Sequence, residues 1–238
     1  MIKEYASLYS QKEGGFSKKL ATNLLGFLKG RHYMVKSILD VACGTGEFLS
    51  VMGNGCSDLN GFDFEPAMIE IARKQVPEAT LVVKDLFDFD FGRTFDLISC
   101  NYETVNFALN TEQLDKLFGN IAKHLSDNGI FVFDFKTPLE KVADDFVFEE
   151  GVMFDYLKDV STNGLEYKKH EIFYAASKDN YHKIVNDEVR RAWDVKDIKA
   201  ALARAGFVNE NWVDYDLRVL KNPKKCDRVH CLCYKRKV

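Results

Sequence analysis

Two glycines that directly follow an apolar run are the first residues with a clear chemical meaning. Residues 38–48 read Ile-Leu-Asp-Val-Ala-Cys-Gly-Thr-Gly-Glu-Phe, so the apolar segment stops at Gly44 and Gly46 and resumes as a helix. Glycine permits positive φ and lets the backbone approach a ligand closely. In an open α/β sheet, a ligand lies beyond the carboxyl ends of the strands, where the strand order reverses. The segment therefore predicts a buried parallel strand and a turn that contacts a ligand.

The residues that follow the turn argue against a phosphate ligand. A dinucleotide-binding fingerprint would continue with a third glycine, where this chain has Leu49, and the lysine of a P-loop is also missing. A pyrophosphate favours the positive end of a helix, yet Glu47 places a carboxylate there. That charge suits a ligand that carries a positive charge.

Carboxylates at the ends of the next two predicted strands fit an adenosine. Asp63 ends the second strand and can accept hydrogen bonds from both ribose hydroxyls. Asp85 ends the third strand and can accept a hydrogen bond from an adenine amino group. The neighbouring Phe64, Leu86 and Phe87 offer apolar faces for the base.

An amino-acid portion of the ligand can be placed on the first strand. Asp40 and the carbonyls near Ala42 can meet an ammonium group, although Asp40 could instead orient the glycine turn through backbone N–H groups. Adenosine joined to an amino acid and carrying a positive charge describes S-adenosylmethionine. Met68 could touch the ribose or adenine edge, or belong to the core of its helix.

The loop after the fourth predicted strand faces the position of the methyl group. It reads Asn-Tyr-Glu-Thr-Val-Asn-Phe over residues 101–107 and lacks the Pro-Pro signature of methylases that act on nucleic-acid bases. Carbonyls near Asn101 could hold the ammonium group, and Tyr102 and Glu103 are the candidate catalytic residues. Glu103 could deprotonate or orient an acceptor, or only begin a short helix at its favourable end.

Predicted strands and helices alternate along the chain, and they must position these candidate residues. Strands are expected at 37–42, 58–63, 80–83, 95–100 and 130–135, with helices at 47–52, 67–75 and 112–125. A helix at 195–205 and two final strands near 207–217 and 228–234 would complete the sheet. Alternation of this kind predicts a Rossmann-like, doubly wound α/β fold with a mostly parallel seven-stranded sheet.

Two further segments are predicted to complete one domain that covers residues 1–238. Residues 1–35 are expected to contain a mobile lead and a helix that starts after Gly14-Gly15. Tyr5 and Tyr9 make the lead a candidate lid over the cofactor. Residues 146–192 show apolar-polar alternation and an Asn163-Gly164 turn signal, which predicts an antiparallel β insertion after strand five on the acceptor side. Candidate pocket residues there are His170, Tyr174, Arg191 and Trp193.

As a set, these motifs resemble the class I S-adenosylmethionine-dependent methyltransferases over residues 36–137. The resemblance is carried by the glycine turn, Asp63 in Gly-Phe-Asp-Phe-Glu-Pro-Ala-Met, Asp85-Leu86, Phe95-Asp-Leu-Ile and the strand after Asn128-Gly129. The later portion resembles, more loosely, bacterial sugar N-methyltransferases. The predicted cofactor-binding residues are Tyr9, Asp40, Ala42, Gly44, Thr45, Gly46, Asp63, Phe64, Met68, Asp85, Leu86 and Asn101.

The net charge, the apolar runs and the cysteines limit the partners, the location and the metal content that we expect. A formal net charge of -3 argues against a nucleic-acid-coating protein, and no run approaches the length of a membrane span. Six cysteines without an apolar leader favour a cytoplasmic protein with reduced thiols. The group Cys226, His230, Cys231 and Cys233 lacks paired zinc knuckles, so no metal is expected.

Three hypotheses follow from the sequence. The first is methyl transfer to a small-molecule amine or hydroxyl, with orientation of the two reactants as the main catalytic device. The others are an RNA or protein methyltransferase, which the charge disfavours, and a non-catalytic S-adenosylmethionine-binding module. The chain could act as a monomer or a homodimer.

Overall fold

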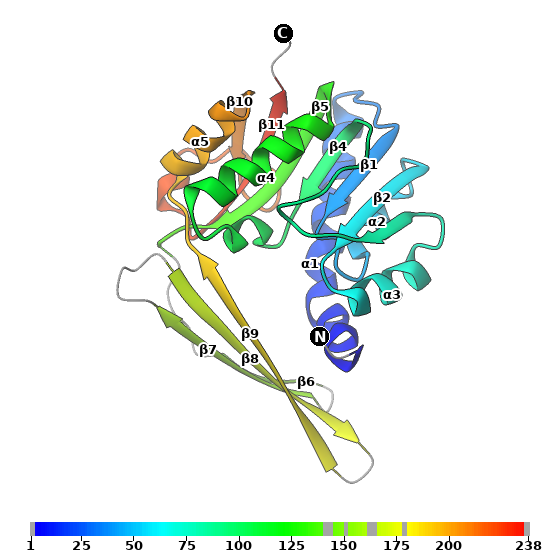
Figure 1. The fold of residues 1–238 in the computed structure, drawn as a ribbon, viewed down its shortest axis with the longest axis vertical. Helices are drawn as coiled ribbons and strands as arrows, with labels where there is room; N and C mark the ends of the chain where they lie inside the picture. The colour runs from blue at the N-terminus through cyan, green and yellow to red at the C-terminus, as the bar shows by residue number, and fades with distance from the viewer. Residues whose placement is uncertain (1–2, 140–144, 150–151, 161–165, 178–179, 236–238) are drawn as a thin grey trace.

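A seven-stranded sheet forms the body of the protein in the computed structural model, which describes residues 3–139, 145–149, 152–160, 166–177 and 180–235 (Figure 1). Side chains of residues 145–184 and of several residues before Gly14 lie outside the described part. The strand order is β10-β11-β5-β4-β1-β2-β3. The strands are β1 (Ser37–Val41), β2 (Asp58–Asp63), β3 (Thr80–Val83), β4 (Phe95–Cys100), β5 (Leu125–Lys136), β10 (Phe207–Val213) and β11 (Arg228–Lys235).

The strand order reverses between β1 and β4, which is the position where ligands bind in such sheets. Strands β1 to β5 run parallel, and β11 is antiparallel to both β5 and β10. Asp40 of β1 lies level with Gly61 of β2 and Ser99 of β4. The carboxyl ends of these strands therefore meet at one edge, and the predicted doubly wound fold is confirmed.

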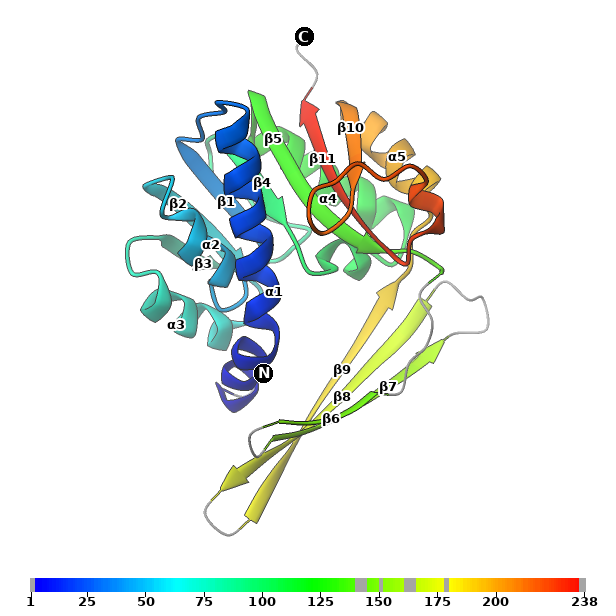
Figure 2. The same ribbon diagram turned by 180° about the vertical axis from the view of Figure 1, so that it is seen from behind.

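Helices cover both faces of the sheet and enclose two apolar cores. Figure 2 shows α1 (Lys3–Gly30) along one face, which it shares with α2 (Glu47–Met52) and α3 (Pro66–Gln75). The other face carries α4 (Thr111–His124) and α5 (Val195–Arg204), beneath which lies a core rich in phenylalanine (Figure 1). Burial of the strands on both faces explains why their sequences are nearly continuous apolar runs.

The first helix is longer than the sequence indicated. The prediction of a mobile lead before a helix that starts after Gly14-Gly15 is wrong, because α1 runs without a break from Lys3 to Gly30. The reason is packing. A Cβ at Gly14 would lie 3.0 Å from Cγ of Glu47, so this glycine allows close contact between α1 and α2 and does not end the helix. The helix thereby brings its N-terminal turns to the carboxyl edge of the sheet.

A second, four-stranded antiparallel sheet follows strand β5, as predicted, and extends away from the body beyond the carboxyl ends of the main strands (Figures 1 and 2). Its strands are β6 (Asp145–Glu149), β7 (Val152–Val160), β8 (Glu166–Ser177) and β9 (Asn180–Arg191). Strand β9 returns to the body and leads into α5. The predicted turn at Asn163-Gly164 lies outside the described residues.

Several predicted boundaries shift by a few residues. Helix α4 begins at Thr111, one residue before the expected start, and is capped by Asn110, whose side chain accepts the N–H of Gln113 at 2.9 Å. Strand β10 ends at Val213 and does not reach Leu217. Beyond Val213 the chain turns back, because the N–H of Leu217 donates to the carbonyl of Asp214 and that of Leu220 donates to the carbonyl of Trp212.

The described residues form neither a candidate membrane span nor a candidate metal site. Across that part of the chain, no helix has the length and apolar character needed to cross a membrane. Among the same residues, no group of three or more His, Cys, Asp or Glu side chains is placed to hold a metal ion. Cys231 and Cys233 of β11 are instead buried together in one apolar core.

Candidate functional site

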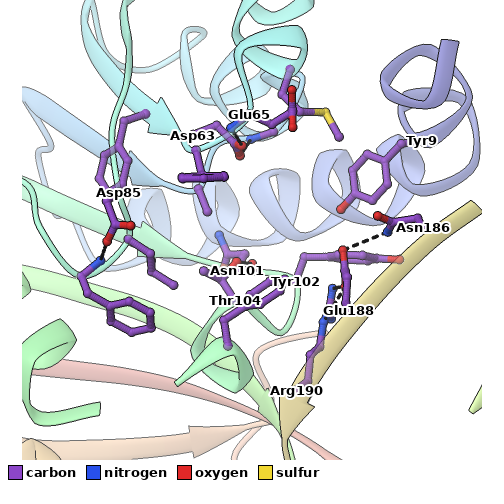
Figure 3. Close-up of a pocket in the computed structure, with 18 residues that line it drawn as sticks. Tyr9, Asp63, Glu65, Asp85, Asn101, Tyr102, Thr104, Asn186, Glu188 and Arg190 are labelled. Carbon is purple, nitrogen blue, oxygen red and sulfur yellow. Dashed lines mark hydrogen bonds and ion pairs between the residues drawn. The ribbon is translucent and has the colours of Figure 1, made fainter. Parts of the chain in front are cut away.

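A cavity of about 420 Å³ opens at the carboxyl edge of the main sheet (Figure 3). Its volume falls within the range of small-molecule sites. The cavity is lined by Tyr9, Ala42, Gly44, Phe62, Asp63, Phe64, Glu65, Met68, Asp85, Leu86, Phe87, Asn101, Tyr102, Thr104, Phe107, Asn186, Glu188 and Arg190. The first helix, strands β1 to β4 with their following loops, and β9 of the second sheet all contribute to it.

Most of the predicted cofactor residues meet in this one cavity. Those that line it are Tyr9, Ala42, Gly44, Asp63, Phe64, Met68, Asp85, Leu86 and Asn101, together with the candidate catalytic residue Tyr102. Asp40, Thr45 and Gly46 lie behind the wall and support it. The described side chains do not include Tyr5.

The two glycines of the turn, Gly44 and Gly46, have different structural roles. Gly44 has a φ of 54°, lines the cavity and donates its N–H to Oδ2 of Asp63 at 2.9 Å. Gly46 has a φ of 90°, and a Cβ there would lie 3.2 Å from Cβ of Ala72 on helix α3. Gly44 therefore keeps the ligand side open, whereas Gly46 lets the turn pack against a helix.

Asp40 and Glu47 secure the turn from behind. Ser99 donates its hydroxyl to Oδ1 of Asp40 at 2.6 Å, and burial together with nearby carboxylates raises the pKa of Asp40 to about 7. Glu47 is buried and accepts the hydroxyl of Thr45 at 2.6 Å and that of Ser10 from helix α1. Both carboxylates thus hold neighbouring elements in register with the turn.

The two carboxylates predicted to bind the adenosine, those of Asp63 and Asp85, both line the cavity. Asp63 accepts the N–H groups of Gly44 and Glu65, both at 2.9 Å, and burial raises its pKa. Asp85 accepts the N–H of Phe87 at 2.7 Å. Since each carboxylate has about four lone-pair positions, both retain capacity for hydrogen bonds from a ligand.

The ring of Phe64 and the side-chain amide of Asn101 also line the cavity. Phe64 lines the cavity although it is 70% exposed, so its ring is available to a planar base. Asn101 is only 8% exposed, and neither polar atom of its side chain has a hydrogen-bond partner among the residues that the structure describes. A buried amide without partners is costly, so a polar ligand in the cavity would satisfy it. These residues fit a cofactor with an adenosine and a charged amino-acid portion.

The loop after β4 is held in an unusual backbone conformation. Tyr102 and Glu103 both have a φ of 62°, which is uncommon for residues other than glycine. Asp134 of β5 accepts the N–H of Tyr102 at 2.5 Å and that of Glu103 at 3.1 Å, and it also accepts Nε of Arg228 at 2.7 Å. This fully buried carboxylate therefore shapes the loop that faces the cavity.

The side chain of Glu103 points toward cations. Its Oε2 lies 2.9 Å from Nη1 of Arg190, and its Oε1 lies 3.5 Å from Nη1 of Arg228 and 3.9 Å from Nζ of Lys136. Tyr102, in contrast, lines the cavity and packs edge-on against Tyr9 with 5.9 Å between ring centroids. Of the two candidate catalytic residues, Tyr102 faces the cavity, and Glu103 joins the loop to β5, β9 and β11.

Strand β9 contributes residues that the sequence did not single out. Asn186, Glu188 and Arg190 line the cavity opposite Asp63 and Asp85 (Figure 3). Alternation of side chains along a strand could have suggested them, but only once the inward face was known.

The predicted roles of Arg191 and Trp193 in the pocket are wrong. Nη1 of Arg191 donates to the carbonyl of Leu109 at 3.0 Å, and the indole N–H of buried Trp193 donates to the carbonyl of Ala108 at 3.0 Å. Both point away from the cavity because they follow the inward-facing Arg190 at the end of β9. The side chains of His170 and Tyr174 lie outside the described part.

Comparisons with known proteins agree with this arrangement. Residues 38–129 match the methyltransferase domain family. A dTDP-4-amino-2,3,4,6-tetradeoxy-D-glucose N,N-dimethyltransferase of Saccharopolyspora spinosa is 36% identical over 112 residues, 47% of this chain and 45% of the relative. A dTDP-3-amino-3,4,6-trideoxy-alpha-D-glucopyranose N,N-dimethyltransferase of Streptomyces venezuelae is 32% identical over 48% of each chain. The chain thus spans about half the length of these curated relatives.

Solved structures extend the similarity in fold to nearly the whole chain. An S-adenosylmethionine-dependent methyltransferase from Clostridium acetobutylicum superposes with a TM-score of 0.86 at 20% identity and covers 98% of both chains. The sugar N-methyltransferase KedS8 from Streptoalloteichus superposes with a TM-score of 0.78 at 24% identity, covering 100% of this chain and 94% of its own. Residues 38–129 therefore form a methyltransferase domain, set in the fold of the class I S-adenosylmethionine-dependent methyltransferases.

Proposed function

We propose that this protein transfers the methyl group of S-adenosylmethionine to a small-molecule amine. The observation that carries the proposal is that one cavity at the reversal of strand order is lined by Gly44, Asp63 and Asp85 and, opposite them, by strand β9 of the second sheet. The curated relatives named above are sugar N,N-dimethyltransferases, which supports an amine as acceptor. An amino sugar is the first class of acceptor to test.

One wall of the cavity binds the cofactor, and the opposite wall binds the methyl acceptor. On the cofactor side, Asp63 accepts the ribose hydroxyls, Asp85 accepts the adenine amino group, and Asn101 meets the amino-acid portion. The sulfonium supplies an already activated methyl group. Tyr9 and Tyr102 can surround a sulfonium with aromatic faces, which attract cations.

The second sheet closes the acceptor side. Residues 186–190 of β9 lie across the cavity from the cofactor wall, and helix α1 lies beside them through Tyr9 (Figure 3). In this proposal the chain is one methyltransferase unit, in which the described parts of residues 1–35 and 146–192 cover the ligands. Holding an amine in line with the S–CH₃ bond can lower the barrier by roughly 7–11 kcal/mol at best, so orientation is the main contribution of the protein.

Titration calorimetry with S-adenosylmethionine and S-adenosylhomocysteine tests the first premise. Binding of both is expected, and binding of neither would refute the proposal. A methyl-transfer assay with 3-amino and 4-amino sugars, alone and linked to a nucleotide, then tests the acceptor class. Turnover only with an RNA or a protein would reject the small-molecule acceptor, and tight binding without turnover on any acceptor would indicate a non-catalytic module.

A further inference from the structure

Three alternate residues at the end of β9 share the inward face of the strand. Asn186, Glu188 and Arg190 are partly or fully buried and line the cavity, whereas the intervening Asp187 and Val189 are exposed. Side chains of a strand alternate between its two faces, so this order sets an amide, a carboxylate and a guanidinium side by side. Figure 3 shows them beside Tyr9 and Tyr102, opposite the cofactor wall.

Arg190 serves to hold its neighbours. Its Nε and Nη2 lie 2.9 and 2.6 Å from Oε2 of Glu188, and its Nη1 lies 2.9 Å from Oε2 of Glu103. The guanidinium also lies 4.5 Å from the centre of the Phe107 ring, and the residue is only 4% exposed. Two carboxylates thus neutralise Arg190, and the guanidinium fixes the position of Glu188.

Glu188 differs from Glu103 in what surrounds it. Glu103 contacts three cations and joins the loop to three strands. Glu188 lines the cavity, and its Oε1 accepts the amide N–H of Asn186 at 3.0 Å. A carboxylate oxygen has room for a second donor, so Oε1 can receive an N–H from a molecule in the cavity.

We propose that Glu188, positioned by Asn186 and Arg190, is the residue that binds the acceptor amine. This proposal rests on the proposed function and specifies its acceptor as an amine that still carries an N–H. The described residues of the cavity wall include four carboxylates, those of Asp63, Glu65, Asp85 and Glu188, and one guanidinium that is already ion-paired. This balance of charge favours a cationic or neutral amine next to the methyl group.

With Glu188 in this role, methyl transfer to the amine proceeds as follows. A neutral amine donates an N–H to Oε1 of Glu188 and directs its lone pair at the methyl carbon. The N–C bond forms as the S–C bond breaks, and the bonding electron pair of the S–C bond remains on sulfur, which becomes a thioether. The methylated nitrogen then carries a positive charge, and its proton passes to Glu188 and from there to water.

Sinefungin tests this assignment without knowledge of the natural acceptor. This analogue carries a primary amine on the carbon that replaces the sulfonium, so its nitrogen lies where the methyl group is transferred. S-adenosylhomocysteine has no group there. The wild-type protein is expected to bind sinefungin more tightly than S-adenosylhomocysteine, as measured by titration calorimetry.

The Glu188→Gln variant is expected to lower the preference for sinefungin by about tenfold, with the affinity for S-adenosylhomocysteine little changed. Glu188→Asp keeps the charge one methylene further back and is expected to retain part of the preference. Glu112→Gln, which changes an exposed carboxylate on helix α4, is the matched control and should leave both affinities unchanged.

The remaining outcomes would contradict either the role of Glu188 or the proposed function. An unchanged preference in Glu188→Gln, or an equal loss of both affinities, would overturn the assignment of Glu188. If glutamine at this position prevents folding, an unchanged preference in Glu188→Asp overturns it instead. Failure of the wild-type protein to bind either ligand would refute the proposed function itself, and this inference with it.

Discussion

The backbone N–H of Tyr102 donates to Oδ1 of Asp134 at 2.5 Å, across 32 positions of the sequence. The same carboxylate holds Glu103 and Arg228, so one buried side chain joins the loop after β4 to two strands. The loop carries Tyr102 to the cavity and Glu103 to Arg190 of β9. The position of this loop at the cavity therefore depends on Asp134.

Replacing Asp134 with asparagine should destabilise the protein strongly. The change removes the charge opposite Arg228 while the arginine stays largely buried, and breaking a buried ion pair on one side costs about 3–5 kcal/mol. Chemical denaturation would measure the difference in free energy of unfolding. Asp115→Asn breaks an exposed pair with Arg204 and is expected to cost only about 0–1 kcal/mol. Equal effects of the two changes would contradict the role given to Asp134.

Removal of the Asp63 carboxylate should weaken cofactor binding. Asp63→Ala deletes the proposed acceptor for the ribose hydroxyls and releases the N–H of Gly44. Hydrogen bonds to a charged group contribute about 1.5–3 kcal/mol each, so the affinity for S-adenosylhomocysteine is expected to fall roughly 10- to 100-fold. Asp58→Ala, at the opposite end of the same strand, is the control in calorimetry. A normal affinity in Asp63→Ala would place the ribose elsewhere.

Two glycines with positive φ allow a matched comparison of packing. An alanine at position 46 would meet Ala72 at 3.2 Å and Val76 at 3.3 Å, while an alanine at Gly92 would meet no atom within 4 Å. Gly92→Ala is therefore expected to cost about 1 kcal/mol from backbone strain alone. Gly46→Ala adds overpacking and is expected to cost roughly 2–4 kcal/mol. Similar melting temperatures for the two variants would show that the turn relaxes easily.

The pH dependence of stability should report on Asp40. Burial raises the pKa of this carboxyl from 3.8 to about 7 in the folded protein. The folded state therefore binds more protons than the unfolded state between these values, and the contribution of Asp40 to stability is lost as pH rises from about 4 to 7. The Asp40→Asn variant should lack this part of the pH dependence in denaturation experiments. Parallel profiles of variant and wild type would show that Asp40 titrates normally.

The sequence by itself determined the sheet and one wall of the cavity. Strands and helices alternate with short connections, so apolar runs and breaks could be placed within a few residues. The carboxyl ends of neighbouring parallel strands must meet at one edge, and this alone predicts that Gly44, Asp63, Asp85 and Asn101 lie close together. These inferences succeeded because each depends on local pattern and on the topology of one sheet.

Only the tertiary structure decided the opposite wall. The contact of Arg190 with Glu103 spans 87 positions, and that of Arg228 with Asp134 spans 94. A shift of one residue in β9 would turn Glu188 away and bring Val189 inward, and the alternating sequence is compatible with either face. Docking of β9 against the loop at Tyr102 fixes that choice. It therefore also decides which side chains face the acceptor.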